Sequence, residues 1–282
     1  WTPADAAAAG ARSLVIGVAP KGGQFADNWI PVLRAAVDAG LDIVSGMHSK
    51  LAEVPGLAAA AQARGVRLVD VRTPPAGLPT GSGRKRSGMR LLTVGTDCGL
   101  GKKYTALALA HALQARGVDA DFRATGQTGI MIAGSGIPLD AVVADFIAGA
   151  AECLSPDAAP EHWDIVEGQG SLFHPAYAGV TLGLIHGSQP DALVLCHDPQ
   201  RTHVNSLRDF ALPSLDLAAA RNLEAARLTN PAARLVGVSL ITENMGDEQR
   251  ARVLGAAEKL LGVPAFDPLR TSLQPVLDRL LP

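Results

Sequence analysis

The feature that most restricts the fold of this chain is an alternation of short aliphatic runs with segments of helical periodicity. Runs such as SLVIGVA at 13–19, RLLTVG at 90–95 and ALVLCHDP at 192–199 have the length and composition of buried strands. Helical patterns between such runs are typical of βαβ units, in which helices cover a parallel sheet. With 282 residues, 48% apolar and only 4% aromatic, the chain is long enough for two such domains with aliphatic cores.

One segment interrupts the alternation. Residues 73–88, TPPAGLPTGSGRKRSG, are rich in Pro, Gly, Ser and charge, as expected of an inter-domain connection. We predict a Rossmann-like N-terminal domain at 1–78, a linker at 79–88 and a P-loop NTPase-like α/β domain at 89–282, each with a mostly parallel sheet. Helices of the second domain are expected up to about 116 and near 139–153, 214–228 and 247–261.

The stretch VGTDCGLGKKYT at 94–105 joins a predicted strand to a predicted helix. Its glycines let backbone N–H groups point inward, the helix start adds partial positive charge, and Lys102 adds a full charge. We therefore expect a di- or triphosphate to bind here rather than a plain glycine-rich turn. The predicted binding residues are Gly95, Thr96, Asp97, Cys98, Gly99, Gly101, Lys102, Lys103, Tyr104 and Thr105.

Two departures separate this loop from the plain GxxxxGK[ST] pattern. Five residues, not four, lie between Gly95 and Gly101, and Lys103 occupies the position at which nucleotide-hydrolysing P-loops place a magnesium-binding hydroxyl. The next hydroxyl is that of Thr105, which starts from a different part of the helix surface. Phosphate binding without phosphoryl transfer is therefore possible. Cys98 is either a small loop residue or a nucleophile at a helix start.

Polar residues at the carboxyl ends of the other predicted strands are further candidates, because ligands of doubly wound sheets bind there. Glu167 follows the strand WDIV and begins EGQGSLFHP, so it is a candidate general base, or else a turn carboxylate that accepts backbone N–H groups. His174, seven residues later, is the second candidate base.

Cationic residues near the same strand ends are candidates for binding carboxylates of a substrate. Arg201, His203 and Arg208 lie in CHDPQRTHVNSLR, and Arg123 lies in FRATGQTG; a guanidinium binds carboxylates in pairs of hydrogen bonds. Arg123 is equally consistent with a solvated surface position. No spacing of His, Cys and acidic residues indicates a metal site, and we predict none.

Charge and cysteine content narrow the partners and the compartment. A net charge of −2, from 25 basic and 27 acidic residues, argues against nucleic acid as a partner. Cys98, Cys153 and Cys196 form no CxxC pair, which favours a reducing, cytoplasmic location. With no apolar run of membrane-spanning length and no signal-peptide pattern at the start, we expect a cytoplasmic protein that binds small molecules, with no membrane partner, and forms a homo-oligomer.

Two resemblances add to this interpretation. GTDxxxGK is the form of the loop in dethiobiotin synthetase, and EGQGSLFHP is similar to its VEGxGG stretch. In their order and spacing, APKGGQF at 19–25, GTDCGLGKKYT, EGQGSLFHP and CHDPQR resemble the D-glutamate N-acetyltransferase-like family, whose members pair a Rossmann-like domain with a P-loop domain.

This second resemblance implies transfer of an acetyl group from acetyl-CoA to the amino group of D-glutamate. Acetyl-CoA is then a co-substrate whose phosphates bind the loop, and no metal is required. Two alternatives stay open: a ligase or kinase of a small carboxylate that uses Mg-ATP with help from Thr105 or Asp97, and a non-catalytic module that binds a nucleotide or CoA.

Overall fold

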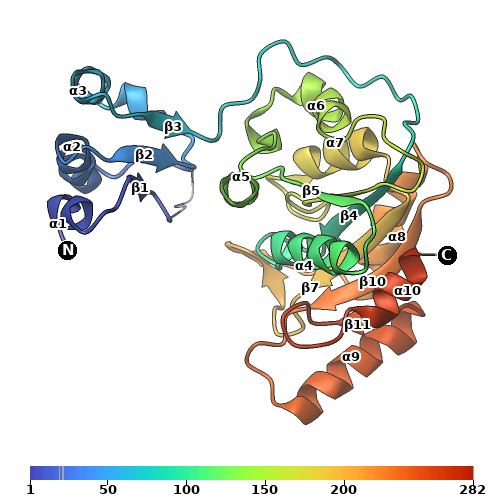
Figure 1. Ribbon diagram of the computed structural model, residues 1–282. Coiled ribbons are helices and arrows are strands. Elements are labelled where there is room, and N and C mark those ends of the chain that lie inside the picture. The colour runs from blue at the N-terminus through green and yellow to red at the C-terminus, as the bar shows by residue number, and fades with distance from the viewer. Residues whose placement is uncertain (19, 21, 282) are drawn as a thin grey trace.

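The computed structural model of the protein describes residues 1–18, 20 and 22–281, which form two α/β domains (Figure 1). Ala19 and Lys21, which belong to the predicted strand 13–19 and to APKGGQF, lie outside the described residues. No helix formed by the described residues combines the length and apolar character needed to cross a membrane.

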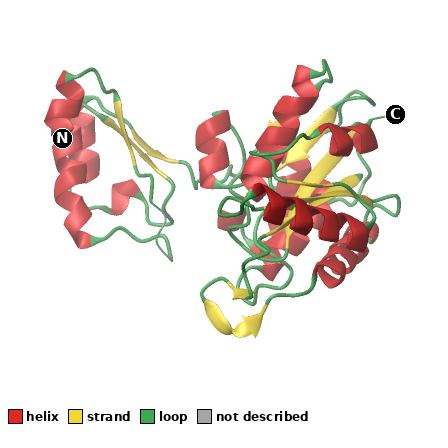
Figure 2. Cartoon of the chain, turned by 90° about the horizontal axis from the view of Figure 1, so that it is seen from below, coloured by secondary structure: helices red, strands yellow, loops and turns green. Residues whose placement is uncertain are grey.

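The N-terminal domain is a three-stranded parallel sheet in the order β1-β2-β3. Its elements are α1 (Pro3–Ala8), β1 (Ser13–Val15), α2 (Ile30–Asp38), β2 (Asp42–Ser45), α3 (Leu57–Arg64) and β3 (Leu68–Asp70). The helices lie on the side of the sheet away from the second domain (Figure 2). Apolar residues of α2, α3 and β2, such as Leu33, Leu57 and Ile43, form one buried cluster there.

The C-terminal domain contains a six-stranded parallel sheet in the order β11-β10-β7-β4-β6-β5. The strands are β4 (Met89–Gly95), β5 (Ala120–Arg123), β6 (Trp163–Val166), β7 (Ala192–His197), β10 (Arg234–Leu240) and β11 (Ala265–Phe266). The helices are α4 (Lys102–Ala115), α5 (Gln127–Ala133), α6 (Ile147–Leu154), α7 (Ala178–Ser188), α8 (Leu215–Arg227), α9 (Asp247–Leu261) and α10 (Gln274–Leu280). The predicted mostly parallel α/β architecture is confirmed.

Alternating side chains of the central strands build two cores, one on each face of this sheet. Leu92 and Val94 of β4 face the cluster that contains α6, α7, α8 and α9. Leu91, their neighbour on the same strand, faces the cluster formed by α4 and α10. The sheet is therefore buried between two helical layers, which explains its continuous aliphatic runs.

Several elements differ from the prediction. The helix expected near 139–153 begins only at Ile147, after two single 3₁₀ turns at Leu139–Ala141 and Ala144–Phe146. Between these turns the β-branched residues Val142 and Val143 have extended backbone conformations, which interrupt helical hydrogen bonding. The helices α1, α5 and α7 were not predicted. Neither was the antiparallel hairpin of β8 (His203–Val204) and β9 (Leu207–Ala211), which projects from the domain (Figure 2).

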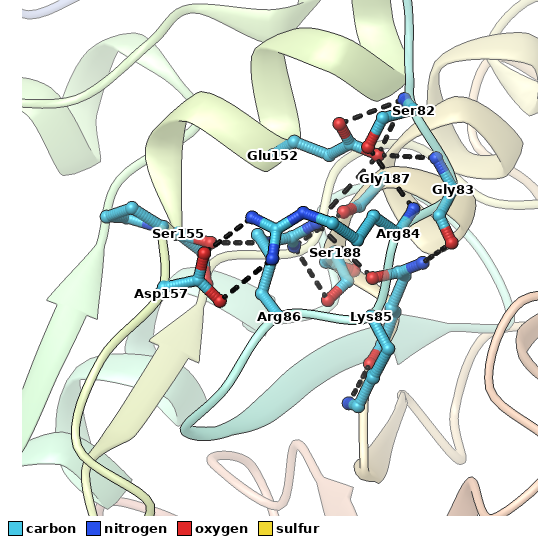
Figure 3. A network of polar contacts seen from close by, with 12 residues as sticks. Ser82, Gly83, Arg84, Lys85, Arg86, Glu152, Ser155, Asp157, Gly187 and Ser188 are labelled. Carbon is cyan, nitrogen blue, oxygen red and sulfur yellow. Dashed lines mark hydrogen bonds and ion pairs between the residues drawn. The ribbon is translucent and has the colours of Figure 1, made fainter.

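The segment predicted as a linker is largely bound to the second domain (Figure 3). The backbone N–H groups of Ser82 and Gly83 donate to the carboxylate of Glu152. Arg86 is buried, and its guanidinium donates to carbonyl oxygens that include those of Ser155 and Gly187 at 2.7 and 2.8 Å. The chain therefore reaches β4 along a defined path instead of as a free tether.

Candidate functional site

A cavity of about 960 Å³ lies between the two domains. Its lining residues come from the first domain (Pro20, Gly22, Gly23, Gly46, Met47, His48 and Arg72), from residues 98–104, from the start of α5 with Asp140, from 167–170 with His174 and Tyr177, and from 205–207 of the hairpin. The segments after β4, β5 and β6 all contribute, as expected for the carboxyl edge of a doubly wound sheet.

The loop between β4 and α4 has the conformation of a phosphate cradle. Gly99 and Gly101 have φ values of 64° and 78°, a left-handed region that glycine adopts without steric cost. Lys102, the first residue of α4, is only 6% exposed, and its Nζ donates to the backbone oxygen of Asp97 at 2.8 Å. Burial lowers the pKa of Lys102. A bound anion would stabilise the charged ammonium there.

The ten predicted loop residues divide into two groups. Cys98, Gly99, Gly101, Lys102, Lys103 and Tyr104 line the cavity, whereas Gly95, Thr96, Asp97 and Thr105 are not among its lining residues. The Thr105 hydroxyl lies 2.8 Å from Oγ of Ser239, on the inner side of the helix. The Lys103 Nζ lies 4.7 Å from the centre of the Tyr104 ring. Lys103, and not the threonine hydroxyl, thus lines the cavity.

Arg201 holds the loop in shape. Its Nη1 donates to Oδ2 of Asp97 at 3.0 Å and to the backbone oxygen of Cys98 at 2.7 Å. The same Asp97 oxygen accepts the backbone N–H of Asn205 at 2.6 Å. The guanidinium predicted to bind a substrate is therefore engaged with the protein, because the buried Asp97 carboxylate needs a cationic partner.

The structure brings Glu167 to the cavity. Its side chain follows β6 and is 5% exposed, and its Oε2 accepts the backbone N–H groups of Thr125 and Gly126 at 2.9 and 3.1 Å. Burial raises the pKa of Glu167. The two backbone hydrogen bonds and the charge of Lys103 lower it, but the effect of burial is larger. Gly129 permits this approach, since a Cβ there would lie 2.2 Å from Oε2. A carboxylate of raised pKa in a cavity is suited to proton transfer.

His174 is also at the cavity, although its geometry favours donation over proton abstraction. The buried ring lies 4.4 Å from the Tyr177 ring, and its Nδ1 accepts the backbone N–H of Ala176 at 3.1 Å. A neutral imidazole that accepts at Nδ1 carries its proton on Nε2. Of the two side chains, Glu167 is therefore better placed to accept a proton and His174 to donate a hydrogen bond.

The remaining predicted substrate residues do not reach the cavity. Arg123 lies at the end of β5, but its Nε donates back along the sheet to Oδ1 of the buried Asp164 at 2.5 Å. Arg208 and His203 are exposed on the hairpin, and neither is among the cavity-lining residues described. Arg123 is held away from the cavity by the buried carboxylate of Asp164. Arg208 and His203 lie on the projecting hairpin, at positions that do not line the cavity.

The cavity residues that were not predicted from the sequence include His48, Arg72, Gln127 and Asp140. Nη1 of Arg72 lies 3.1 Å from Oδ2 of Asp140, its Nη2 donates to Oε1 of Gln127 at 2.7 Å, and its guanidinium also contacts Nε2 of His48. Arg72 follows the last strand of the first domain. Ligands of doubly wound sheets bind at the carboxyl ends of strands, and this criterion also indicates Arg72.

Among the residues that the structure describes, two groups of side chains have donor atoms close enough to hold a metal ion. They are Asp97, Cys98 and His174, and Asp121, His162 and Asp164, each with atoms within 4.8 Å of one another. In both groups an arginine already pairs with the carboxylates: Arg201 with Asp97, and Arg123 with Asp121 and Asp164. The cationic guanidinium disfavours a second cation at the same oxygen atoms.

Comparisons with known proteins cover both domains. Residues 2–74 match a family model described as the DUF1611_N Rossmann-like domain, and residues 78–277 match the DUF1611_C P-loop domain, both of unknown function. Proteins named D-glutamate N-acetyltransferase from Tritonibacter scottomollicae and from a Pseudoalteromonas species are 50% and 49% identical over 276 residues, or 98% of this chain and 83% of theirs. A crystal structure of a DUF1611 family protein from Anabaena variabilis has a TM-score of 0.92 at 36% identity, over 99% of this chain and 82% of that chain.

Proposed function

The chain belongs to the DUF1611 family, and we propose that it transfers the acetyl group of acetyl-CoA to the amino group of D-glutamate. The family resemblance and the two domain types predicted from the sequence are confirmed. The predicted enzyme class, an acyltransferase, is confirmed by relatives that match almost the whole chain. The identity of donor and acceptor is the part that we propose.

The observation that carries the proposal is a phosphate cradle that faces a carboxylate across one cavity. Lys102, Lys103 and the loop of positive-φ glycines present cations and N–H groups, and Glu167 lines the same cavity. Coenzyme A carries a pyrophosphate and a ribose phosphate, which such a cradle binds through backbone N–H groups and lysines. A cavity of about 960 Å³ is at the upper end of the range for small-molecule sites.

Acetyl transfer needs a free amine and a stabilised oxyanion. Glu167 accepts a proton from the substrate ammonium, so that the amine attacks the thioester carbon. The C–S bond then breaks, and the CoA thiolate takes up the second proton that the nitrogen loses as the amide forms. The negative charge that develops on the thioester oxygen requires donors fixed in advance. The loop N–H groups and Nε2–H of His174 are the candidates at this cavity.

The alternative reaction, a Mg-ATP-dependent ligase or kinase, has weaker support from the donor set. Thr105 is hydrogen-bonded to Ser239, and Asp97 is bound by Arg201 and by a backbone N–H. Lys103 stands where the metal-binding hydroxyl is found in hydrolytic P-loops. The oxygen atoms that this alternative would use for magnesium are thus engaged elsewhere.

The test is release of free CoA thiol from acetyl-CoA with D-glutamate, with L-glutamate or with no amino acid, each in magnesium and in EDTA. We expect release that requires D-glutamate and is equal under both conditions. A Lys102→Met variant should raise the KM for acetyl-CoA about 10- to 100-fold through loss of charge-assisted hydrogen bonds. The exposed Lys259→Met variant is the matched control. No thiol release, with amino-acid-dependent consumption of Mg-ATP instead, would establish the ligase reaction.

A further inference from the structure

The Arg72–Asp140 pair connects the two domains inside the cavity. Arg72 follows β3 of the first domain, Asp140 follows β5 of the second, and both line the cavity. The side chain of Arg72 is 11% exposed and that of Asp140 is 24% exposed. This is an ion pair largely removed from solvent, where hydrogen-bond partners matter most.

Both members of the pair retain unused hydrogen-bonding capacity. Nε of Arg72 and Oδ1 of Asp140 are buried, and neither has a hydrogen-bond partner among the described residues. Buried polar atoms are nearly always hydrogen-bonded, so exceptions in a cavity call for an explanation. The unpartnered donor belongs to a cationic guanidinium, and the unpartnered acceptor belongs to an anionic carboxylate. They are therefore complementary to the carboxylate and to the ammonium group of an amino acid, respectively.

The other cationic residues near the cavity belong to the phosphate loop or bind it. Lys102 and Lys103 belong to the phosphate loop, and Arg201, which holds that loop, is paired with Asp97. No other arginine among the residues described as lining the cavity competes with Arg72. Nη1 of Arg72 pairs with Asp140 and its Nη2 donates to Gln127, so a substrate carboxylate would bind the guanidinium by replacing these contacts.

We propose that Arg72 binds the α-carboxylate of the amino-acid acceptor and that Asp140 binds its ammonium group. The amino-acid zwitterion lies between the two side chains. The ion pair of Arg72 with Asp140 is then replaced by one ion pair of Arg72 with the ligand carboxylate and one of Asp140 with the ligand ammonium. This inference rests on the proposed function, since it names the residues that recognise the acceptor of that reaction. Arg72 and Asp140 are then substrate-binding residues, and Glu167 is the base.

The position of Asp140 relative to Glu167 supports this arrangement. Asp140 and Glu167 line the same cavity, and the charge of Asp140 contributes to the raised pKa of Glu167. An ammonium bound by Asp140 therefore lies in the same cavity as the base that deprotonates it. His48, which contacts the Arg72 guanidinium, has a pKa lowered by burial and by that same cation. It is therefore neutral at pH 7 and adds no repulsion to a bound ammonium.

The experiment compares Arg72→Gln with the matched control Arg67→Gln. Arg67 lies in the same domain and is ion-paired with Asp42, but it is exposed and is not among the cavity-lining residues described. We expect Arg72→Gln to raise the KM for D-glutamate about 10- to 100-fold, as for loss of charge-assisted hydrogen bonds. The KM for acetyl-CoA should change less than about twofold. Arg67→Gln should leave both constants unchanged.

A second comparison identifies which carboxylate Arg72 binds. 4-Aminobutyrate is glutamate without its α-carboxylate, so Arg72→Gln should weaken its binding much less than that of D-glutamate. Calorimetric titration of D-glutamate and of 4-aminobutyrate, in the presence of CoA, measures this without turnover. Asp140→Asn should weaken both ligands, because both carry the ammonium that Asp140 binds.

The outcomes separate this inference from the proposed function. Wild-type protein that binds D-glutamate calorimetrically but releases no CoA thiol contradicts the acetyl transfer and leaves the assignment of Arg72 to be decided by titration. Unchanged D-glutamate binding in Arg72→Gln overturns the assignment. So does an equal loss for both substrates, which indicates a purely structural pair. Should Arg72→Gln lower the thermal midpoint, Arg72→Lys keeps the charge and should still weaken D-glutamate binding through loss of the planar fork.

Discussion

At the scale of single residues, burial gives ordinary side chains particular roles. Glu167 and Asp97 are both carboxylates at strand ends, and both are at most 5% exposed. Asp97 is bound by Arg201 and by two backbone N–H groups, so it is a structural anion. Glu167 receives two backbone hydrogen bonds on one oxygen atom and has a raised pKa because of its burial. Of the two, Glu167 is therefore suited to take up a proton.

We predict that the raised pKa of Glu167 limits activity on the acid side. Burial raises the pKa of Glu167 above the usual range of a glutamate side chain, and the base form is lost as pH falls through this raised pKa, so kcat/KM for D-glutamate should decline there. Glu167→Gln should lower kcat by about 10²- to 10⁴-fold and remove that limb from the pH profile. The exposed Glu224→Gln is the control. An unchanged acid limb in Glu167→Gln would rule out this residue as the base.

The raised pKa of Glu167 also predicts that the Glu167→Gln variant remains folded. Because the folded-state pKa of Glu167 is higher than the unfolded-state value, its ionisation lowers the free energy of unfolding as pH rises through that interval. A neutral amide has no such cost. Glu167→Gln should therefore be at least as stable as wild type at pH 7 by urea unfolding, which separates a loss of activity from a loss of fold.

At the scale of elements, small residues decide how closely helices approach. A Cβ on Gly187 of α7 would lie 2.1 Å from the backbone oxygen of Ala148 in α6, and a Cβ on Gly149 would lie 1.9 Å from the oxygen of Pro79. A Cβ on Gly255 of α9, by contrast, would have no heavy atom within 4 Å. Glycine is therefore a packing requirement at 187 and 149, but not at 255.

We predict that alanine at position 187 and alanine at position 255 change the free energy of unfolding in opposite directions. Gly187→Ala should lower the free energy of unfolding by about 1–3 kcal/mol, because backbone atoms of α6 must move. Gly255→Ala should raise it by about 0.5–1 kcal/mol through helix propensity. Urea unfolding followed by circular dichroism measures both. A stabilised Gly187→Ala would show that α6 and α7 do not pack this closely.

At the scale of the whole molecule, the site depends on how the two domains are joined. The cavity takes residues from both domains, and the connecting segment is held on the second domain at Ser82, Gly83 and Arg86 (Figure 3). Burial lowers the pKa of Arg86 to about 10, so Arg86 remains charged at pH 7. A fixed connection limits the positions that Arg72 can take relative to the phosphate loop.

We predict that loss of this anchor destabilises the second domain. Arg86→Met removes the buried guanidinium that donates to the carbonyl groups of Ser155 and Gly187 and should lower the free energy of unfolding by about 2–4 kcal/mol. Arg84→Met, which removes an exposed ion pair with Asp157, should cost less than about 1 kcal/mol. Equal unfolding free energies for the two variants would contradict an anchoring role for Arg86.

Features that depend on nearby residues could be predicted from the amino-acid sequence. Strand, loop and helix around Lys102 follow from local periodicity and from glycines that must adopt positive φ, and Glu167 follows from its place directly after a buried strand. The helix near 139–153 was only partly correct, because Val142 and Val143 extend the backbone within a pattern that looks helical.

The partner of each charged side chain, by contrast, depends on long-range contacts in the folded chain. Arg201, Arg123 and Arg72 are the same residue type, each near a strand end, yet Arg201 binds Asp97, Arg123 binds Asp164, and Arg72 faces the cavity with Asp140. These partners come from other strands and, for Arg72, from the other domain. Strand order and domain packing bring them together, and local sequence pattern carries no information on either. The loop around Lys102 could thus be predicted from local pattern, whereas the pairing of Arg72 with Asp140, on which the proposed acceptor site rests, depends on how the domains meet.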